Sequence, residues 1–277
     1  MKNNRLILIY DDKCPLCAAY TKFFVTTGIL SSSGRKSFSS VDPALLQLTD
    51  PLRSNNEIPL IDTQTGQVLY GIDALLELLN TKLYGIKVIG RFAPVYWLLK
   101  KLYRFISYNR KVVVAARCSE GEYDCSPAFN YKWRLIFLFG FLLFNTIALF
   151  PVQSYVVSNS FFSGSSIFYV QVLHAFLVAS NLLLAVTLKK QRAFEYLGQV
   201  NMLATIAVLG MLLLAGINKY LFVNLFFNNG FLLLLLVVIV KEYIRRMRFA
   251  GTLQLKYITI SNACCIMVFL AAMTVKL

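Results

Sequence analysis

Apolar positions follow two different patterns along this chain and divide it into two parts. In the second part they form five runs, each near the ~20 residues that a bilayer core requires, and each run predicts a membrane-spanning helix. The runs are residues 135–152, 167–188, 196–217, 221–240 and 258–275. Because a very short turn at 216–220 separates the third run from the fourth, a tight hairpin and a re-entrant pair are both open.

The apolar runs of the first part are shorter and alternate between strand and helix patterns. Residues 6–10, 37–41, 58–61 and 68–70 predict strands, while the segments that begin at Pro15 and Asp73 predict helices. A strand-helix unit followed by a hairpin and a helix is the order of a thioredoxin-like fold. We therefore predict an α/β thioredoxin-like domain at 1–112, a linker at 113–131 and an all-α transmembrane bundle of about five helices at 132–277.

Composition supports this division. The chain of 277 residues is 57% hydrophobic and only 15% charged, which is too apolar for an ordinary soluble protein. Of its thirteen Asp and Glu residues, only Glu195 and Glu242 lie beyond Arg134. Acidic side chains are thus almost confined to the first part, which indicates a domain boundary near Tyr131.

The basic excess, a net charge of +15, follows the order of the predicted spans. Lys and Arg gather before the first span and after the second and fourth, whereas residues 153–166 contain none. Topology explains this spacing better than a nucleic-acid ligand does, and the positive-inside rule puts the N-terminal domain in the cytoplasm and the C-terminus outside. Residues 1–10 show no signal-peptide pattern. We expect a protein integral to the plasma (bacterial inner) membrane that binds no nucleic acid.

Cys14 and Cys17 stand where the first predicted strand passes into the first helix. In Cys14-Pro15-Leu16-Cys17 both cysteines fall at the first helical turn, where unpaired backbone N–H groups and the helix dipole favour a thiolate. We therefore predict that Cys14 is the nucleophile. Cys17, one turn further on and more enclosed, is then the resolving thiol that attacks a mixed disulfide formed at Cys14.

Pro59 stands at the head of the third predicted strand. A proline there indicates an edge strand or a cis peptide bond, and a cis bond is rare enough to have a purpose. In thioredoxin-like folds such a proline faces the dithiol and leaves the preceding backbone free to pair with an incoming peptide. We predict this role for Pro59, with an ordinary strand-edge proline as the alternative.

Two cysteines, Cys118 and Cys125, lie in the short polar linker before the first span. Core packing does not explain cysteines in such a loop. A second redox pair and a zinc site shared with Cys14 and Cys17 are both open, whereas a permanent disulfide does not suit a reducing cytoplasm.

The membrane part offers little other chemistry. Cys264 and Cys265 are adjacent in the last span, where packing is the ordinary role and an intramembrane thiol relay the alternative. His174, the only histidine, lies in the second span, where an interhelical hydrogen bond is the ordinary role and a metal or proton role the alternative. The polar residues of the spans form no ionisable chain of the kind that pumps use. We predict neither a metal ion nor another cofactor.

The segment 83–106 combines aromatic with basic residues. Its aromatic residues are Tyr84, Phe92, Tyr96, Trp97, Tyr103 and Phe105, and its basic residues are Lys87, Arg91, Lys100, Lys101 and Arg104. Such a mixture is typical of a helix on a membrane surface. A pair of helices that is broken at Pro94, packs on the sheet and exposes its lysines explains the same residues, so both interpretations are open.

Four blocks within residues 5–112 resemble, in order, the DCC family of thiol-disulfide oxidoreductases, small thioredoxin-like domains named for an aspartate and two cysteines. The blocks are residues 10–17, the Ile58-Pro59 strand, the helix start Gly71-Ile72-Asp73-Ala74, and the segment from Tyr103 to the Asn109-Arg110 pair. The resemblance implies that Asp11, Cys14 and Cys17 carry thiol-disulfide exchange. Asp12 stands where the family usually has glycine, and its negative charge is expected to raise the pKa of Cys14.

The leading hypothesis is therefore a membrane-anchored thiol-disulfide oxidoreductase that exchanges disulfides with protein thiol or disulfide partners through Cys14 and Cys17. A second hypothesis is a non-catalytic membrane interaction or assembly subunit whose thioredoxin-like domain only binds a partner. Asp12 and a bundle without catalytic residues favour this second hypothesis. A third is an anchor stabilised by zinc.

Overall fold

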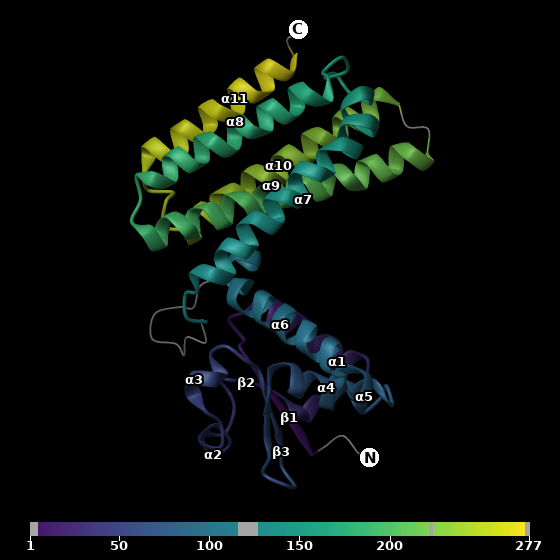
Figure 1. Cartoon of the computed structure of the whole chain (residues 1–277), viewed down its shortest axis with the longest axis vertical. Helices are drawn as coiled ribbons and strands as arrows, with labels where there is room; N and C mark the ends of the chain where they lie inside the picture. Colours follow the sequence, from purple (N-terminus) through teal and green to yellow (C-terminus); the bar gives the residue numbers. More distant parts are fainter. Residues whose placement is uncertain (1–4, 116–126, 222–223, 275–277) are drawn as a thin grey trace. The chain divides into compact units, whose positions relative to one another are not determined.

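The computed structural model describes residues 5–115, 127–221 and 224–274, and the chain divides into two compact units, Met1–Trp133 and Arg134–Leu277. The first unit holds a four-stranded sheet with its helices, and the second holds five long apolar helices (Figure 1). The fold class predicted from the sequence is confirmed. The predicted domain boundaries at 112 and 131 stay a prediction.

The sheet has the strand order β2-β1-β3-β4. β1 (Leu6–Tyr10) pairs parallel with β2 (Arg35–Ser37) and antiparallel with β3 (Pro59–Asp62), and β3 pairs antiparallel with β4 (Val68–Tyr70). A parallel pair needs a crossover, which α1 (Pro15–Thr26) supplies, whereas the antiparallel pair of β3 and β4 needs only a short turn.

Alternate residues of β1 fill a core on each face of the sheet. Leu6 and Leu8 pack among buried residues of α1 and α4 (Gly71–Asn80), and Ile9 packs with Phe38 and Val41 on the opposite face. Figure 1 shows α1 and α4 on one side of the strands, with α2 (Pro43–Gln47) and α3 (Pro51–Ser54) on the other. A sheet covered on both faces explains the short, fully apolar runs of the sequence.

The second strand differs from its prediction. The sequence predicted a strand at 37–41, but β2 ends at Ser37 after a 3-10 turn at Ser32–Gly34. Phe38 and Val41 are apolar because they cover one face of the sheet, not because they extend the strand.

Two helices follow α4 and end the first unit's regular structure before the linker. α5 (Ile86–Arg91) and α6 (Ala93–Val114) are separated at Phe92, and Pro94 lies in the first turn of α6. Proline suits this place because an N–H in the first turn has no partner within the helix. The helix pair broken near Pro94 is therefore present. α6 is long enough that its C-terminal part reaches the dithiol.

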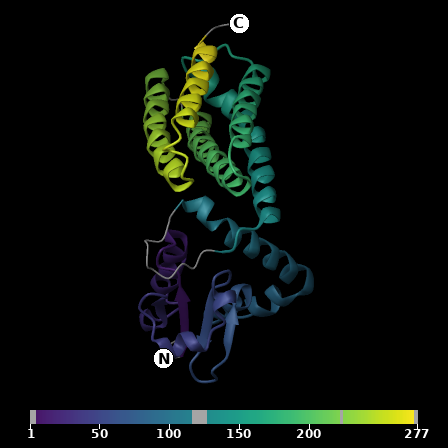
Figure 2. The same cartoon turned by 90° about the vertical axis from the view of Figure 1, so that its left-hand side faces the viewer.

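The second unit contains five helices that are long and apolar enough to cross a membrane. They are α7 (Tyr131–Tyr155), α8 (Ile167–Val186), α9 (Lys190–Tyr220), α10 (Leu225–Phe249) and α11 (Lys256–Thr274), with a 3-10 turn at Val157–Asn159 after α7. α9 packs against α8 and α10, and α11 packs against α8; Figure 2 shows these long helices side by side. Each predicted span thus corresponds to one of these five candidate helices, and α9 and α10 are each long enough to cross a bilayer.

Charged side chains lie inside this bundle near the helix ends. Arg134 pairs with Glu195 at 3.3 Å. Arg246, which is 1% exposed, pairs with Glu242 at 3.1 Å and donates to the Gln199 side chain at 2.8 Å. The apolar runs do not predict these pairs, because Arg134, Glu195 and Glu242 lie just outside them.

Candidate active site

The dithiol lies at the start of α1. Cys14 is the N-cap residue, with an extended backbone (φ −98°, ψ 103°), and Pro15 follows in the first turn, where proline is favoured. The Sγ of Cys14 accepts a hydrogen bond from the backbone N–H of Cys17 at 3.2 Å. A sulfur thus takes the place that a Ser or Asp oxygen takes at most helix starts, facing the positive end of the helix dipole.

The two thiols differ in acid strength. The pKa of Cys14 is lowered from its ordinary 9.0 to about 7, chiefly by a hydrogen bond from the Cys17 side chain; burial opposes this, while the Cys17 N–H and the charge of Arg110 assist it. The pKa of Cys17 is raised, chiefly because the same hydrogen bond holds its proton and also because it is buried. Above pH 7 the pair therefore holds one proton on Cys17, with the thiolate on Cys14.

Burial separates both sulfurs from bulk water. Cys14 is 8% and Cys17 4% exposed, while Pro15 between them in the chain is exposed. The chemistry of the pair therefore depends on the protein groups around the sulfurs more than on solvent.

Arg110 of α6 is the cation of the site. Its Nη1 donates to the Sγ of Cys17 at 3.8 Å, and its Nη2 lies 3.5 Å from a carboxylate oxygen of Asp11. The same Nη2 donates to the carbonyl of Asn55 at 3.2 Å. Arg110 therefore ties the dithiol turn to the loop before Pro59, and its charge favours a thiolate on either cysteine.

Asp11 closes the turn between β1 and α1. Its side chain accepts a hydrogen bond from the backbone N–H of Lys13 at 3.0 Å, and its carbonyl accepts one from the N–H of Cys14 at 3.2 Å. It is 5% exposed and pairs with Arg110, so the buried guanidinium has a counter-charge. Asp11 thus fixes both the position of Cys14 and the position of Arg110.

Asp12 has polar partners of its own. Its carboxylate accepts a hydrogen bond from the Ser39 hydroxyl at 3.1 Å and lies 3.9 Å from the Lys13 ammonium. The charge of Arg110 lowers the pKa of Cys14 and that of Asp11 raises it, and on balance this pKa is lowered. The effect of Asp12 relative to glycine stays a prediction.

Pro59 is the first residue of β3, opposite Tyr70 of β4. β3 lies between β1 and β4, so it is not an edge strand, and no peptide bond within the described ranges is cis. Both structural explanations predicted for Pro59 are therefore wrong. Proline is tolerated here because the first residue of a strand need not donate to the ladder. Its orientation toward the dithiol stays a prediction.

The backbone before Pro59 is occupied. The N–H of Ile58 donates to the Tyr103 hydroxyl at 2.9 Å, and the Ile58 carbonyl accepts from the N–H of Gly71 at 3.0 Å. Gly71 has a positive φ of 59°, and a side chain there would press against Tyr103 and Glu57. The prediction of a free backbone at this point is therefore contradicted: a partner peptide would first have to displace the Tyr103 hydroxyl.

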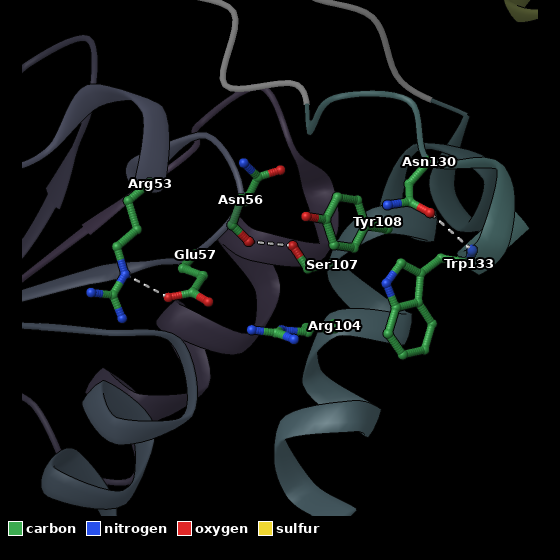
Figure 3. A pocket seen from close by; sticks show the side chains of 8 residues that line it. All are labelled: Arg53, Asn56, Glu57, Arg104, Ser107, Tyr108, Asn130 and Trp133. Carbon is green, nitrogen blue, oxygen red and sulfur yellow. Dashed lines mark hydrogen bonds and ion pairs between the residues drawn. The ribbon is translucent and has the colours of Figure 1, made fainter. Parts of the chain in front are cut away.

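A polar pocket of about 380 Å³ lies between the same loop and α6 (Figure 3). It is lined by Arg53, Asn56, Glu57, Arg104, Ser107, Tyr108, Asn130 and Trp133. Among these lining residues, the Ser107 hydroxyl donates to the Asn56 carbonyl, and Arg53 pairs with Glu57 at 2.9 Å. Its lining contains neither cysteine, so it is separate from the dithiol.

The remaining predicted residues do not join this site. Cys118 and Cys125 lie outside the described residues, so the second redox pair and the shared zinc site stay predictions. Cys264 and Cys265 are free thiols on α11, the first exposed and the second half-buried. In the described part of the chain, no three His, Cys, Asp or Glu side chains are grouped to hold a metal ion.

A mixed four-stranded sheet with a Cys-x-x-Cys pair at the start of its first helix defines the class of the first unit, a thioredoxin-like dithiol domain. The family model of the DCC1-like thiol-disulfide oxidoreductases matches residues 8–115. This part of the chain is therefore a DCC1-like domain, as its resemblance predicted, and five candidate membrane helices follow it. Neither a curated protein nor a solved structure matches the chain.

Two residues of the site were not assigned to it from the sequence. Arg110 and Tyr103 both lie in the last block that resembles the family, but 93 positions separate Arg110 from Cys17. Spacing along the chain carries no signal for such a contact. The fold alone brings α6 to the dithiol turn and to Ile58.

Proposed function

We propose that the protein is a membrane-integral thiol-disulfide oxidoreductase in which Cys14 is the attacking thiolate and Cys17 the resolving thiol. One observation carries the proposal: the Sγ of Cys14 caps α1 and accepts the N–H of Cys17 at 3.2 Å. A backbone donor and the helix dipole stabilise the charge of a thiolate, which is the reactive form. The match of residues 8–115 to the family model supports the same class of activity.

The reaction consists of two exchanges. The Cys14 thiolate attacks one sulfur of a partner disulfide, a mixed disulfide forms, and the partner's other sulfur leaves as a thiolate. Cys17 then gives up its proton, which ends on a released partner sulfur, and attacks the Sγ of Cys14; the bond between Cys14 and the partner breaks, and the second partner sulfur leaves as a thiolate. The partner has gained two electrons, and Cys14 and Cys17 have become a disulfide. The reverse sequence oxidises a partner dithiol.

Arg110 and Asp11 support both exchanges. Arg110 is positioned by Asp11 at 3.5 Å and by the Asn55 carbonyl at 3.2 Å, and it faces the Sγ of Cys17 at 3.8 Å. A thiolate at Cys14 before the first exchange, and at Cys17 during the second, develops within the field of this cation. Arg110 therefore stabilises the thiolate electrostatically and does not itself react.

The proposed partners are protein thiols and disulfides on the cytoplasmic face of the plasma membrane. This location rests on the distribution of basic residues around the helices: they precede α7 and follow α8 and α10, while the connections at the other helix ends hold few. The C-terminus is then outside.

The test uses the full-length protein in nanodiscs, with Cys118 and Cys125 replaced by serine so that linker thiols do not contribute. Reduction of a disulfide-bonded peptide is followed, and mixed disulfides are trapped by acid and identified by mass. We expect Cys14→Ser to abolish exchange and Cys17→Ser to accumulate a mixed disulfide at Cys14. Cys264→Ser, a matched change in α11, leaves the rate unchanged.

Undiminished exchange in the Cys14→Ser protein would falsify the proposal. A wild-type protein that binds the peptide but leaves its disulfide intact would favour the non-catalytic binding subunit instead.

A further inference from the structure

The side of α6 that faces its own domain makes polar contacts. Four of its side chains hydrogen-bond to α4 or to the loop before β3: Tyr96 to Asp73, Tyr103 to Ile58, Ser107 to Asn56 and Arg110 to Asn55. Steps of seven, four and three residues keep these four positions on one side of a helix. They therefore fix which side of α6 faces the domain.

The opposite side of α6 is apolar and exposed. Trp97 is 63%, Leu98 59%, Leu102 50% and Ile106 45% exposed. Leu98, Leu102 and Ile106 are four residues apart and form a continuous stripe. A helix on the surface of a soluble domain normally turns its apolar stripe toward the core, whereas the apolar stripe of α6 faces outward.

The exposed apolar surface continues into α5. Val88 is 77% and Ile89 67% exposed, and Phe92, between the two helices, is 64% exposed. α5 lies against α4 through Gly90, where a side chain would collide with Leu76, so its exposed residues cannot turn inward. Among residues 5–115 and 127–133, no side chain covers this surface.

Basic residues border the stripe. Lys100 and Lys101 are exposed on α6, and the Lys101 ammonium lies 5.7 Å from the centre of the Trp97 ring. Between Glu77 and Glu120 the sequence contains nine Lys and Arg and neither Asp nor Glu. A second copy of this surface would bring like charges together, whereas an anionic surface would complement them.

We infer that this surface, the α6 face (Trp97, Leu98, Leu102 and Ile106 with Lys100 and Lys101), binds the surface of an anionic bilayer. The apolar stripe enters the boundary between headgroups and acyl chains, and the basic side chains reach the phosphates. The same chain supplies the bilayer: α6 ends at Val114, and the first candidate span begins at Tyr131. The short connection makes docking intramolecular, which favours even a weak contact.

The test uses Trp97 as its own probe. The chain has two tryptophans, so Trp133→Phe leaves Trp97 as the only one. The full-length protein carrying this change is reconstituted in nanodiscs of phosphatidylcholine with or without phosphatidylglycerol, and the acyl chains are brominated to quench nearby indole fluorescence. We expect a blue shift and quenching of Trp97 in anionic nanodiscs, and weaker quenching in high salt or without phosphatidylglycerol.

Two double variants distinguish an effect on lipid docking from an effect of the lower net charge alone. Lys100→Gln with Lys101→Gln is expected to reduce the docking equilibrium by about fivefold for each charge removed. Lys22→Gln with Lys36→Gln removes the same two charges from α1 and β2 and is expected to leave quenching unchanged. Thiol exchange is measured in parallel as a check that the domain is folded.

Three results would overturn the inference: no quenching of Trp97 in anionic nanodiscs, equal losses in the two double variants, or a blue shift of Trp97 without quenching by brominated lipid. The last would mean that protein covers the α6 face. None of these results bears on exchange at Cys14, so the proposed function and this inference fail separately.

Discussion

The two units of the chain distribute apolar side chains in opposite ways. In the first unit, Leu60 and Ile61 are at most 1% exposed and lie in the cores of the sheet. In the second, Arg246 is among the largest fully buried side chains, while Leu183 and Phe226 are 73% and 82% exposed. Apolar atoms avoid water but lose nothing against lipid tails, so the polarity of what a helix exposes indicates the medium around it.

By this criterion α6 belongs to both media. It is part of the sheet domain through Tyr103 and Arg110, yet its outward stripe resembles the outward faces of the apolar helices of the second unit. A helix that lies along a bilayer surface has this intermediate character.

Two buried arginines illustrate a second difference between the units. Arg246 pairs with Glu242 and donates to the Gln199 side chain. Arg110 faces Cys17, and its charge lowers the pKa of Cys14. Burial of a charge alone therefore does not mark a reactive site; the sulfur next to it does.

The largest expected effect is the loss of apolar packing in the first unit. Leu60→Ala leaves a cavity in the core and is expected to cost roughly 2–5 kcal/mol of unfolding free energy. Leu183→Ala, the matched change on α8, costs less because lipid fills the space. Hydrogen exchange of β1 and α8 in nanodiscs, read by peptide mass, measures both. Equal costs would mean that α8 does not face lipid.

A smaller effect is expected from the charged interior of the bundle. Arg246→Met removes the partner of the Gln199 side-chain oxygen and one partner of Glu242, and is expected to lower the free energy of unfolding by about 1–3 kcal/mol. Glu242 keeps Arg245 at 2.8 Å, so the loss stays below that of a fully broken buried pair. Arg248→Met, an exposed change two residues on, is the control for thermal unfolding in detergent. If the two variants melt alike, the buried pair does not stabilise the bundle.

The sequence predicted the features that depend on local patterns. Run length identified five spans, because a bilayer sets the length of a helix directly. The strand before Cys14 and the proline after it located the dithiol at a helix start, because both signals lie within a few residues of each other.

Features that depend on tertiary contact were missed or mistaken. Pro59 is in a central strand and follows a trans peptide bond. Whether a strand tolerates proline depends on the position within the strand, and the residue type alone does not show that position. The contacts of the Asp12 carboxylate with Ser39 and Lys13 were not predicted from the sequence. Both features depend on distances in space, which spacing along the chain does not give.

The next effect in size concerns the thiolate. Arg110→Gln removes a charge that lowers the pKa of Cys14, so this pKa is expected to rise from about 7 toward 9.0. Arg110→Lys keeps the charge but loses the forked contact in which Nη1 faces Cys17 while Nη2 faces Asp11 and Asn55, so its effect is intermediate. The pH dependence of Cys14 alkylation, read by peptide mass, gives the midpoint. A midpoint that does not move would remove Arg110 from the electrostatics of the site.

The same shift predicts how stability depends on pH. The pKa of Cys14 is lower in the folded domain than its ordinary value, so its thiolate stabilises the fold fully above pH 9, and this stabilisation is lost as the pH falls through about 7. Stability of the first unit should therefore rise between pH 7 and 9, and rise less in Cys14→Ala. Hydrogen exchange of β1 at both pH values, corrected for intrinsic rates, tests it. Equal slopes in the two proteins would contradict the shift.

The smallest expected effect lies between α7 and α9. The Asn145 amide donates to the Asn201 side chain at 3.2 Å, and Asn201 donates to the Leu138 carbonyl at 2.9 Å. Interhelical hydrogen bonds in membranes contribute about 0.6 kcal/mol on average, so Asn201→Leu should cost less than about 1 kcal/mol in thermal unfolding in detergent. A cost as large as that of Leu60→Ala would mean that the bundle depends on buried polar contacts as the sheet domain depends on its apolar core. The contrast between the two units would then lie in which side chains they bury for stability, and not in the medium around them.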